Sequence, residues 1–392
     1  MRILVLAPHP FLQNRGTPLA VKAVVEFLTG RGHEVDVLTF PEGTNPGIPG
    51  CTVHRVPQLP GIRNVRPGFS FRKVVYDLLL TRAAHRLLRR QRYDLVHAVE
   101  ESAFIAMVLR RRFAVPFIYD MDSSMPRQIV ERWPWVRIVA RPMEAAERRA
   151  IRASTAVLTV CRALEDHARH LVPTATIGRV EDTSLITDGS AQPPPDDLPG
   201  GRDLALYVGN LEPYQGIDLL LQAFRLAAPE APDLDLVLVG GAPRHVDKYR
   251  RYAEHLGVGP RVHVLGPRPP ARLGTYLRRA DILVSPRLSG VNTPMKLYSY
   301  LDSGRPVLAT ALPTHEQVLD DSVARLVSPI PEALAEGLVA LARDPETRDR
   351  LGAAGRERYL REYGPTAFDR KMTAFYDGVF AQIAVGPTGR PS

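Results

Sequence analysis

The candidate chemistry of this chain centres on Lys296, in a stretch (residues 281–310) whose pattern predicts a strand, a loop, a helix, a turn and a strand. Asn292 or Thr293 is placed to cap the predicted helix, and Pro294 fits its first turn. A helix that begins just beyond a parallel strand directs free backbone N–H groups into the crevice there, which suits a phosphate. The helix dipole disfavours a cation in that first turn. Lys296 is therefore predicted to bind an anion, and the alternative is a solvated surface lysine.

Polar residues also close two predicted strands in the first half of the chain. His97 and Glu100 follow one strand, and Asp120 and Asp122 follow the next. Open α/β sheets place their ligands at the carboxyl ends of parallel strands. We therefore expect His97 to bond a sugar hydroxyl or move a proton, the alternative being a structural histidine. Asp120 and Asp122 are expected to hold the hydroxyls of an acceptor or to cap the helix that follows, and Glu100 lies at the neighbouring strand end of the same candidate site. No His or Cys pair accompanies them, so no metal site is expected.

These residues need a scaffold that brings strand ends together, and the sequence predicts such a scaffold twice. The chain opens with a buried strand at 2–7, a loop, a helix, and an alternating strand at 33–40. This β–loop–α–β unit is the start of a doubly wound parallel sheet. Gly16 removes a side chain where the loop meets the helix, so backbone can approach a ligand there. A second alternating series of strands and helices begins with the strand at 205–209.

The predicted architecture is α/β, with two doubly wound, Rossmann-like domains that face each other across a cleft. A chain of 392 residues exceeds the usual size of one core. The segment 187–202 contains four prolines and three glycines, which is typical of a linker. We predict an N-terminal domain at 1–186, this linker, a C-terminal domain at 203–364, and a helix at 365–384 that can pack back on the first domain.

The charge of the chain is unevenly distributed. The formal net charge is +9, but residues 1–180 carry 27 Lys and Arg against 15 Asp and Glu. This asymmetry indicates an anionic partner such as a membrane surface, or an arginine bias without a partner. Residues 69–92 predict a basic amphipathic helix, and Trp133 and Trp135 lie beside arginines, as on interfacial surfaces. No nucleic-acid motif is present, so a nucleic-acid partner is not expected.

Other classes are excluded by composition. No run of ~18 apolar residues predicts a membrane span, and the N-terminus lacks the features of a signal peptide. The two cysteines, Cys51 and Cys161, predict neither a disulfide framework nor a zinc site. We expect a cytoplasmic protein without a cofactor. Peripheral contact with the inner face of the membrane is left open.

Three segments resemble the family 4 glycosyltransferases. They are RGTPLAVKAVVEFLTGRGHEVDVLT (15–39), VGNLEPYQGIDLLLQAF (208–224) and PMKLYSYLDSGRPVLAT (294–310). The resemblance covers nearly the whole chain. It implies the GT-B fold and a retaining, metal-independent transferase that uses a nucleotide diphosphate sugar, UDP in preference to GDP. It further implies a sugar, lipid-linked glycan or small-molecule acceptor bound mainly by the N-terminal domain, and a role in cell-envelope polysaccharide synthesis.

The chain departs from this family at four positions. The family commonly carries two glutamates in its donor segment, where Val291 and Ser299 stand here. Its usual Arg and Lys at the start of the C-terminal domain align with Asn210 and Gln215. The resemblance implies donor contacts at these positions. Ser299 can offer one ribose hydrogen bond in place of a carboxylate.

The missing phosphate charges can come from other residues. Lys296, Arg287 and Arg15 are the candidates, and Gly16 and Gly209 allow close backbone approach to the donor. Two further interpretations stay open. The loss of the usual residues favours a non-catalytic sugar-nucleotide-binding or assembly protein at the membrane surface, and a GT-B sugar-nucleotide epimerase would use the donor without an acceptor.

Overall fold

The computed structural model describes residues 1–11, 16–45, 47–61, 71–124, 126, 137–186 and 195–385. The chain divides into two compact units, Met1–Glu181 with Asp369–Ser392 (unit 1) and Asp182–Phe368 (unit 2). Of the linker predicted at 187–202, residues 187–194 lie outside the described residues, and residues 195–202 belong to unit 2. Across the described parts of the chain, no helix has the length and apolar character needed to cross a membrane.

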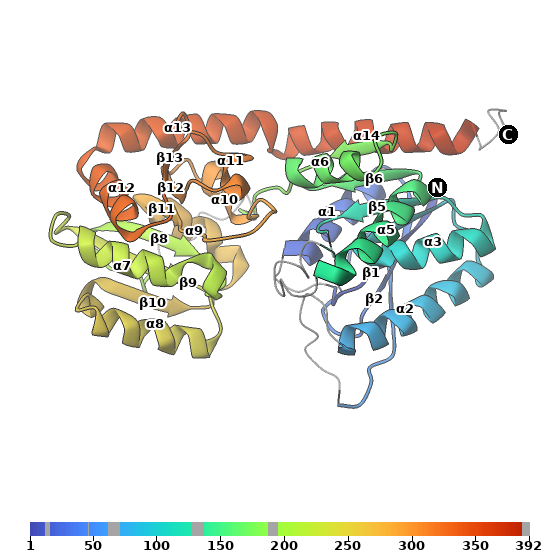
Figure 1. Ribbon diagram of the computed structural model, residues 1–392, viewed down its shortest axis with the longest axis horizontal. Helices are drawn as coiled ribbons and strands as arrows, with labels where there is room; N and C mark the ends of the chain where they lie inside the picture. Colours follow the sequence, from blue (N-terminus) through green and yellow to red (C-terminus); the bar gives the residue numbers. More distant parts are fainter. Residues whose placement is uncertain are drawn as a thin grey trace. The chain divides into compact units, whose positions relative to one another are not determined.

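Unit 1 contains a seven-stranded parallel sheet in the order β3-β2-β1-β4-β5-β6-β7. Its strands are β1 Arg2–Ala7, β2 Glu34–Thr39, β3 Cys51–Arg55, β4 Leu95–Val99, β5 Phe117–Met121, β6 Ala156–Thr159 and β7 Ile177–Arg179. Figure 1 draws these strands in blue and green, and the last helix of the chain, α14 (Pro365–Val385), in red. The direction of strand addition reverses between β1 and β4. That reversal is the topological switch point of the sheet.

Helices cover both faces of this sheet. They are α1 Gly16–Gly30, α2 Phe71–Arg90, α3 Ser102–Phe113, α5 Arg137–Ala153, α6 Arg162–Leu171 and α14 Pro365–Val385. Helices α2, α3, α5 and α6 share one hydrophobic core with the strands. Helices α1 and α14 lie on the other face, where the Phe27 and Tyr376 rings are 5.8 Å apart. The last helix of the chain is therefore, from Asp369 on, part of unit 1.

Unit 2 contains a six-stranded parallel sheet in the order β10-β9-β8-β11-β12-β13. Its strands are β8 Asp203–Val208, β9 Leu234–Val239, β10 Val262–Gly266, β11 Ile282–Ser285, β12 Val307–Thr310 and β13 Ala324–Val327. Its helices are α7 Ile217–Ala227, α8 Pro243–His255, α9 Leu273–Arg279, α10 Lys296–Asp302, α11 Pro313–Glu316, α12 Pro331–Arg343 and α13 Pro345–Glu362. The predicted pair of doubly wound sheets is confirmed.

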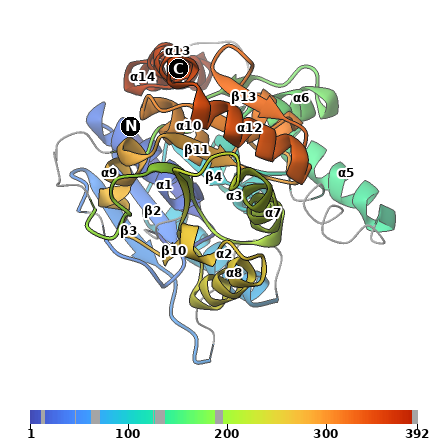
Figure 2. The ribbon, with the colours of Figure 1, turned by 90° about the vertical axis from the view of Figure 1, so that its left-hand side faces the viewer.

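The alternation of side chains along β8 explains how unit 2 forms two cores. Ala205 and Tyr207 point into a core shared with α7, α8 and α12. The ribbons of these three helices are labelled in Figure 2. Leu204 and Leu206 point into a second core with α9, α10 and α13. A strand whose successive side chains are all buried must be apolar throughout. The sequences of these strands are therefore continuous hydrophobic runs.

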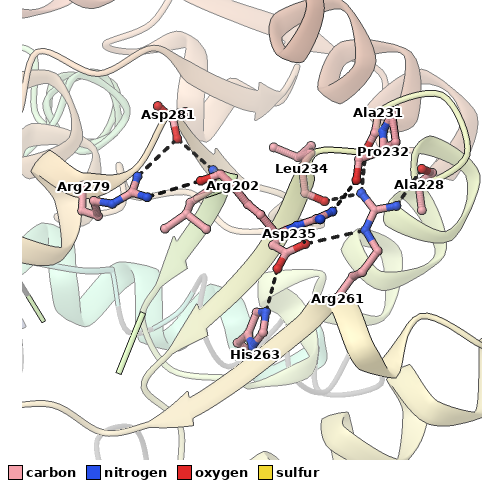
Figure 3. Close-up of polar contacts among 11 residues, drawn as sticks. Arg202, Ala228, Ala231, Pro232, Leu234, Asp235, Arg261, His263, Arg279 and Asp281 are labelled. Carbon is pink, nitrogen blue, oxygen red and sulfur yellow. Dashed lines mark hydrogen bonds and ion pairs between the residues drawn. The ribbon is translucent and has the colours of Figure 1, made fainter. Parts of the chain in front are cut away.

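The amino end of the unit 2 sheet is closed by a buried carboxylate (Figure 3). Asp235 is 3% exposed, and its Oδ1 lies 2.7 Å from Arg202 Nε, while its Oδ2 lies 2.9 Å from His263 Nε2. Arg261 Nε approaches within 3.6 Å of the same carboxylate. A carboxylate buried without such partners would be strongly destabilising. These contacts join β9 to β10 and to the residue before β8.

Unit 1 repeats this arrangement at the same end of its own sheet. Asp36 on β2 lies 2.8 Å from His54 Nε2 and 3.5 Å from Arg2 Nε. It also accepts hydrogen bonds from Tyr93 Oη at 2.8 Å and Gln91 Nε2 at 3.0 Å. In both units an acid on the second strand therefore binds a histidine of the third strand and an arginine at the start of the first.

We predict that Asp235→Asn destabilises unit 2 by about 2 kcal/mol, because it removes the buried carboxylate that accepts charge-assisted hydrogen bonds from the part-exposed Arg202 and His263. The measurement is urea unfolding followed by circular dichroism. The matched control is Asp233→Asn. Asp233 is exposed and lies two residues before Asp235, just ahead of β9. Equal effects of the two substitutions would contradict the proposed role of the Asp235 contacts.

Candidate functional site

The candidate site of unit 2 lies at the switch point of its sheet, between β8 and β11. Gly209 and Asn210 follow β8, and Pro286 and Arg287 follow β11. Because the two strands pair in parallel, both connections leave the sheet at its carboxyl end. This is the position where open α/β sheets bind their ligands.

A short 3-10 helix, η2 (Pro213–Gln215), is pressed against the segment after β11. Gly216 ends it with φ of 73°, and a Cβ there would lie 1.9 Å from the carbonyl oxygen of Pro286. The carbonyl of Tyr214 accepts the N–H of Leu288 at 2.9 Å. A side chain at position 216 is incompatible with this contact, so the glycine is what allows Gln215 to reach the site.

Lys296 is the first residue of α10, and it meets residues from β8 and η2. Its Nζ donates to Gln215 Oε1 at 2.9 Å and lies 3.9 Å from the centre of the Tyr207 ring. A Cβ on Gly209 would be 3.4 Å from Nζ. No carboxylate of the described residues forms an ion pair with Lys296. Three predicted donor-site residues, Gly209, Gln215 and Lys296, are thus brought together.

The electrostatics of this corner disfavour positive charge. Burial lowers the pKa of Lys296 well below its ordinary value, and the nearby charge of Arg287 lowers it further. Burial also lowers the pKa of His315 to about 4, against the hydrogen bond to the Thr310 carbonyl, which raises it. His315 is fixed on both sides, by that carbonyl at 2.7 Å and by Ser285 Oγ at 3.0 Å. An anion bound here would relieve the unfavourable charge on Lys296.

Arg287 organises the loop between β11 and α10. Its Nε donates to the Ser289 carbonyl at 2.6 Å and its Nη1 to the Asn292 carbonyl at 3.1 Å. Its guanidinium carbon lies 5.3 Å from the centre of the Tyr214 ring. The predicted cap at Asn292 or Thr293 is wrong, because α10 begins at Lys296 without a side-chain cap. Arg287 instead holds the carbonyl of Asn292 within the loop.

The other two predicted donor residues of unit 2, Asn210 and Ser299, form hydrogen bonds within the unit. Asn210 Oδ1 accepts the N–H of Glu212 at 3.2 Å, and its Nδ2 donates to Tyr214 Oη at 3.3 Å. Ser299 is 0% exposed, and its Oγ accepts the N–H of Leu185 at 2.9 Å. This burial does not fit the predicted ribose contact of Ser299, because its hydroxyl is directed toward the backbone of unit 2.

In unit 1, the register of the sheet determines where His97 points. His97 pairs with Val5 and faces α1 and α14, where it is 0% exposed. Its Nε2 lies 2.8 Å from Asp120 Oδ2 and its Nδ1 2.8 Å from Tyr376 Oη. With both ring nitrogens occupied inside the core, His97 and Asp120 do not fit their predicted substrate contacts. They attach α14 to the sheet.

Glu100 lies at the carboxyl end of β4 in a positive-φ conformation, with φ of 50°. Its Oε2 is 3.9 Å from Lys73 Nζ, and Glu101 Oε1 is 2.6 Å from the same Nζ. Burial, with a contribution from the Glu100 charge, raises the pKa of Glu101 to about 7, and burial raises that of Asp77 to about 7. Lys73, Asp77 and Glu101 were not predicted as site residues from the sequence. The adjacent Glu100–Glu101 pair after a buried strand was the sequence feature that indicated a charged cluster here.

Asp122 is buried just beyond β5, and a second missed cluster follows it. His167 Nε2 lies 2.8 Å from Glu147 Oε2, and Ser124 Oγ donates to the same oxygen at 3.1 Å. In a nucleophilic triad the histidine bridges serine and acid through different nitrogens. Here all three groups meet at one nitrogen and one oxygen, so the cluster is not such a triad.

The remaining predictions concern the loop before α1 and metal binding. Gly16 is the exposed first residue of α1. Arg15 lies outside the described residues. Within the described ranges, no group of three or more His, Cys, Asp or Glu side chains could hold a metal ion.

Comparison with protein families identifies both halves of the chain. Residues 190–358 match the model of the glycosyl transferases group 1, and residues 15–180 match the glycosyl transferase 4-like domain. A phosphatidyl-myo-inositol mannosyltransferase of Mycobacterium leprae is 24% identical over 387 residues, which is 97% of each chain. A D-inositol 3-phosphate glycosyltransferase of Corynebacterium glutamicum is 31% identical over 47% of this chain and 45% of its own length.

Solved structures share the fold over nearly the whole chain. Sucrose-phosphate synthase from Thermosynechococcus elongatus superposes with a TM-score of 0.78 at 20% identity, covering 97% of this chain and 100% of that one. HepE of Anabaena, solved in complex with UDP, gives a TM-score of 0.73 at 15% identity, covering 96% and 100%. The predicted fold class is confirmed by these likenesses.

We predict that Gly216→Ala disrupts the candidate site of unit 2. The new Cβ would collide with the Pro286 carbonyl and displace Gln215 from Lys296. The matched control is Gly257→Ala, since Gly257 has φ of 75° but no neighbouring atom within 4 Å of a built Cβ. Left-handed strain alone costs about 1–2 kcal/mol at either position. Thermal unfolding should show a larger loss at position 216, and equal losses would contradict the close packing of η2.

Proposed function

We propose that this chain, which belongs to the group 1 glycosyltransferases and has the GT-B fold, transfers a hexose with retention from a nucleotide diphosphate sugar to an acceptor. We further propose that unit 2 binds the donor and unit 1 the acceptor. The donor is UDP-linked in preference to GDP-linked, and the acceptor is a glycan, a lipid-linked glycan or a small molecule.

The observation that carries the donor proposal is the position of Lys296. It is a lysine without a carboxylate partner among the described residues, at the switch point of a parallel sheet. Breaking the bond between the sugar and the diphosphate builds negative charge on the leaving phosphate. A fixed ammonium group stabilises that charge without reorganisation during the reaction. Lys296 can therefore take the part that the family assigns to cations at the positions of Asn210 and Gln215.

The acceptor proposal for unit 1 rests on carboxylates at the carboxyl ends of β4 and β5. Glu100 is part-buried beside Lys73 and Glu101, and Ser123 Oγ donates to Glu100 Oε1 at 3.3 Å. Carboxylates fixed in this way can accept hydrogen bonds from sugar hydroxyls. Glu100 and Asp122 stay as the proposed acceptor contacts. We do not assign acceptor contact to Asp120 or a catalytic role to His97, because both side chains are committed inside the core.

A second candidate function is donor binding without transfer. The neutral residues at positions 291 and 299, and the inward-pointing hydroxyl of Ser299, favour it. An epimerase of the same fold would consume the donor without any acceptor. The two alternatives and the transferase differ in turnover, which product analysis distinguishes.

The donor proposal is tested by thermal unfolding with UDP, GDP and their hexose derivatives, each with magnesium or with EDTA. A ligand that binds only the folded state raises the unfolding temperature. We expect a UDP derivative to do so equally with and without magnesium.

Lys296→Ala should weaken donor binding by about 1–3 kcal/mol, as expected for a hydrogen bond to a charged group.

The matched control is Lys248→Ala, which removes an exposed lysine of the same unit that pairs with Asp218 at 3.1 Å. It should bind the donor like the unmodified protein. Equal affinities of the two variants in calorimetry would remove Lys296 from the donor site. An absence of stabilisation by every nucleotide would contradict the donor proposal itself.

We also propose peripheral contact of unit 1 with an anionic membrane. Helix α2 exposes positions four residues apart, and these are Val74, Leu78, Arg82, Arg86 and Arg90. Helix α3, which shares its core, exposes Arg110, Arg111 and Arg112. Apolar residues beside clustered arginines suit a membrane surface. The phosphatidyl-myo-inositol named in relatives supports a lipid-linked acceptor. The predicted interfacial residues Trp133 and Trp135 lie outside the described residues.

Liposome sedimentation at low salt tests this contact. We expect vesicles with anionic lipid to bind the protein and neutral vesicles to leave it in solution. Charge reversal of Arg82, Arg86 and Arg90 to Glu should weaken binding by more than about a hundredfold, because the loss of three basic residues alone costs about 1 kcal/mol each. The control reverses three exposed arginines of unit 2, namely Arg225, Arg244 and Arg251. Equal losses in the two triple variants would refute a membrane surface on α2.

A further inference from the structure

Lys296 is part-buried, and the contacts of its Nζ atom are with neutral groups. The Gln215 amide accepts its hydrogen bond, the Tyr207 ring covers a second side, and a Cβ built on Gly209 would lie 3.4 Å away. The hydroxyl of Tyr207 already donates its hydrogen bond elsewhere, to the Asn210 carbonyl at 2.6 Å. An ammonium group in such surroundings loses hydration, and the ring face and one amide oxygen compensate only part of that loss.

Titratable or charged groups surround α10 on every packed element. They are Tyr207 on β8, Tyr214 on η2, Arg287 after β11, His315 on α11, Tyr300 on α10 itself, and Arg356 and Tyr359 on α13. Arg287 is a permanent cation whose charge opposes a second positive charge at Lys296. His315 is held in its neutral form by burial. The free site therefore disfavours the ammonium form of Lys296.

We propose that Lys296 takes up one proton from solvent as the donor binds, so that each nucleotide diphosphate sugar enters the site together with a proton. The inference rests on the proposed donor site in unit 2. In this step an N–H bond forms on the Lys296 amine, and the bond that held the proton breaks in the hydronium ion or in the acid form of the buffer. The bound diphosphate supplies the counter-ion that no described residue supplies at this position.

Proton uptake makes the site selective for the charge of its ligand. A sugar nucleotide carries two negative charges on its diphosphate and stabilises the ammonium form of Lys296. A neutral nucleoside supplies no counter-ion, so it binds without a proton and weakly. The same linkage sets the pH dependence of donor binding. Affinity is highest at low pH and falls as pH rises from the pKa of Lys296 in the free protein towards its pKa in the complex.

Calorimetry of the full chain tests the inference, with UDP-glucose and GDP-mannose titrated at one pH in PIPES and in Tris. The diphosphate of a sugar nucleotide has no group that titrates near neutral pH, so any proton taken up from the buffer goes to the protein. The expected result is a difference in binding enthalpy between the buffers that corresponds to uptake of one proton. In a pH series, affinity should fall by up to about tenfold per pH unit within the stated window.

Two variants assign the proton to its site. Lys296→Arg carries a guanidinium that stays charged, and it should bind the donor with equal enthalpy in both buffers. Lys248→Arg, at an exposed position, should keep the buffer dependence. Uptake that persists in Lys296→Arg would place the proton elsewhere, for example on His315, and overturn the inference. Buffer-independent binding by the unmodified protein overturns it while the donor site stands, and no donor binding at all overturns both.

Discussion

A lysine with no acidic partner among the described residues is the constraint around which the carboxyl end of the unit 2 sheet is built. Lys296 is brought by α10 to the Gly209 backbone, the Tyr207 ring and the Gln215 amide. Each of these contacts requires a particular backbone: a glycine after β8, and a left-handed Gly216 that lets η2 touch the Pro286 carbonyl. Several close contacts therefore fix the position of Lys296, and no described residue supplies a counter-ion for its ammonium form. Such an arrangement costs stability unless a ligand completes it.

The opposite ends of the two sheets show the contrast. At the amino ends, Asp36 and Asp235 each have a histidine and an arginine as partners, so the buried charge is compensated within the protein. At the carboxyl ends, no acid among the described residues pairs with Lys296, and Glu101 keeps a raised pKa beside Lys73. Compensated charge secures strand order and register, whereas uncompensated charge marks the places where a ligand changes the energy. In both units the compensated charges at the amino end of the sheet are structural, and the uncompensated charges at the carboxyl end are the candidate functional groups.

The sequence was sufficient for the elements and their order, because apolar strands and amphipathic helices alternate with clear glycine and proline boundaries. It also placed Lys296 at the correct edge. It was insufficient for His97 and Ser299, because a strand or helix position does not reveal which way a side chain points until register and neighbours are known. His97 turns toward Tyr376, which is 279 residues away in sequence, and Ser299 toward Leu185. The pairing of Glu147 with His167 depends on tertiary packing in the same way.

The departures from the family pattern are consistent with one another when charge is considered. The resemblance assigns two cations and two carboxylates to positions that hold Asn210, Gln215, Val291 and Ser299 here. Restoring either cation alone would add to the repulsion between Arg287 and Lys296 in a buried corner. Restoring a glutamate within reach of Lys296 would neutralise the ammonium and compete with a phosphate for it. A neutral background with a single lysine therefore keeps an anion-binding charge available. The four losses are coherent with donor binding through Lys296, and they need not be read as decay of the site.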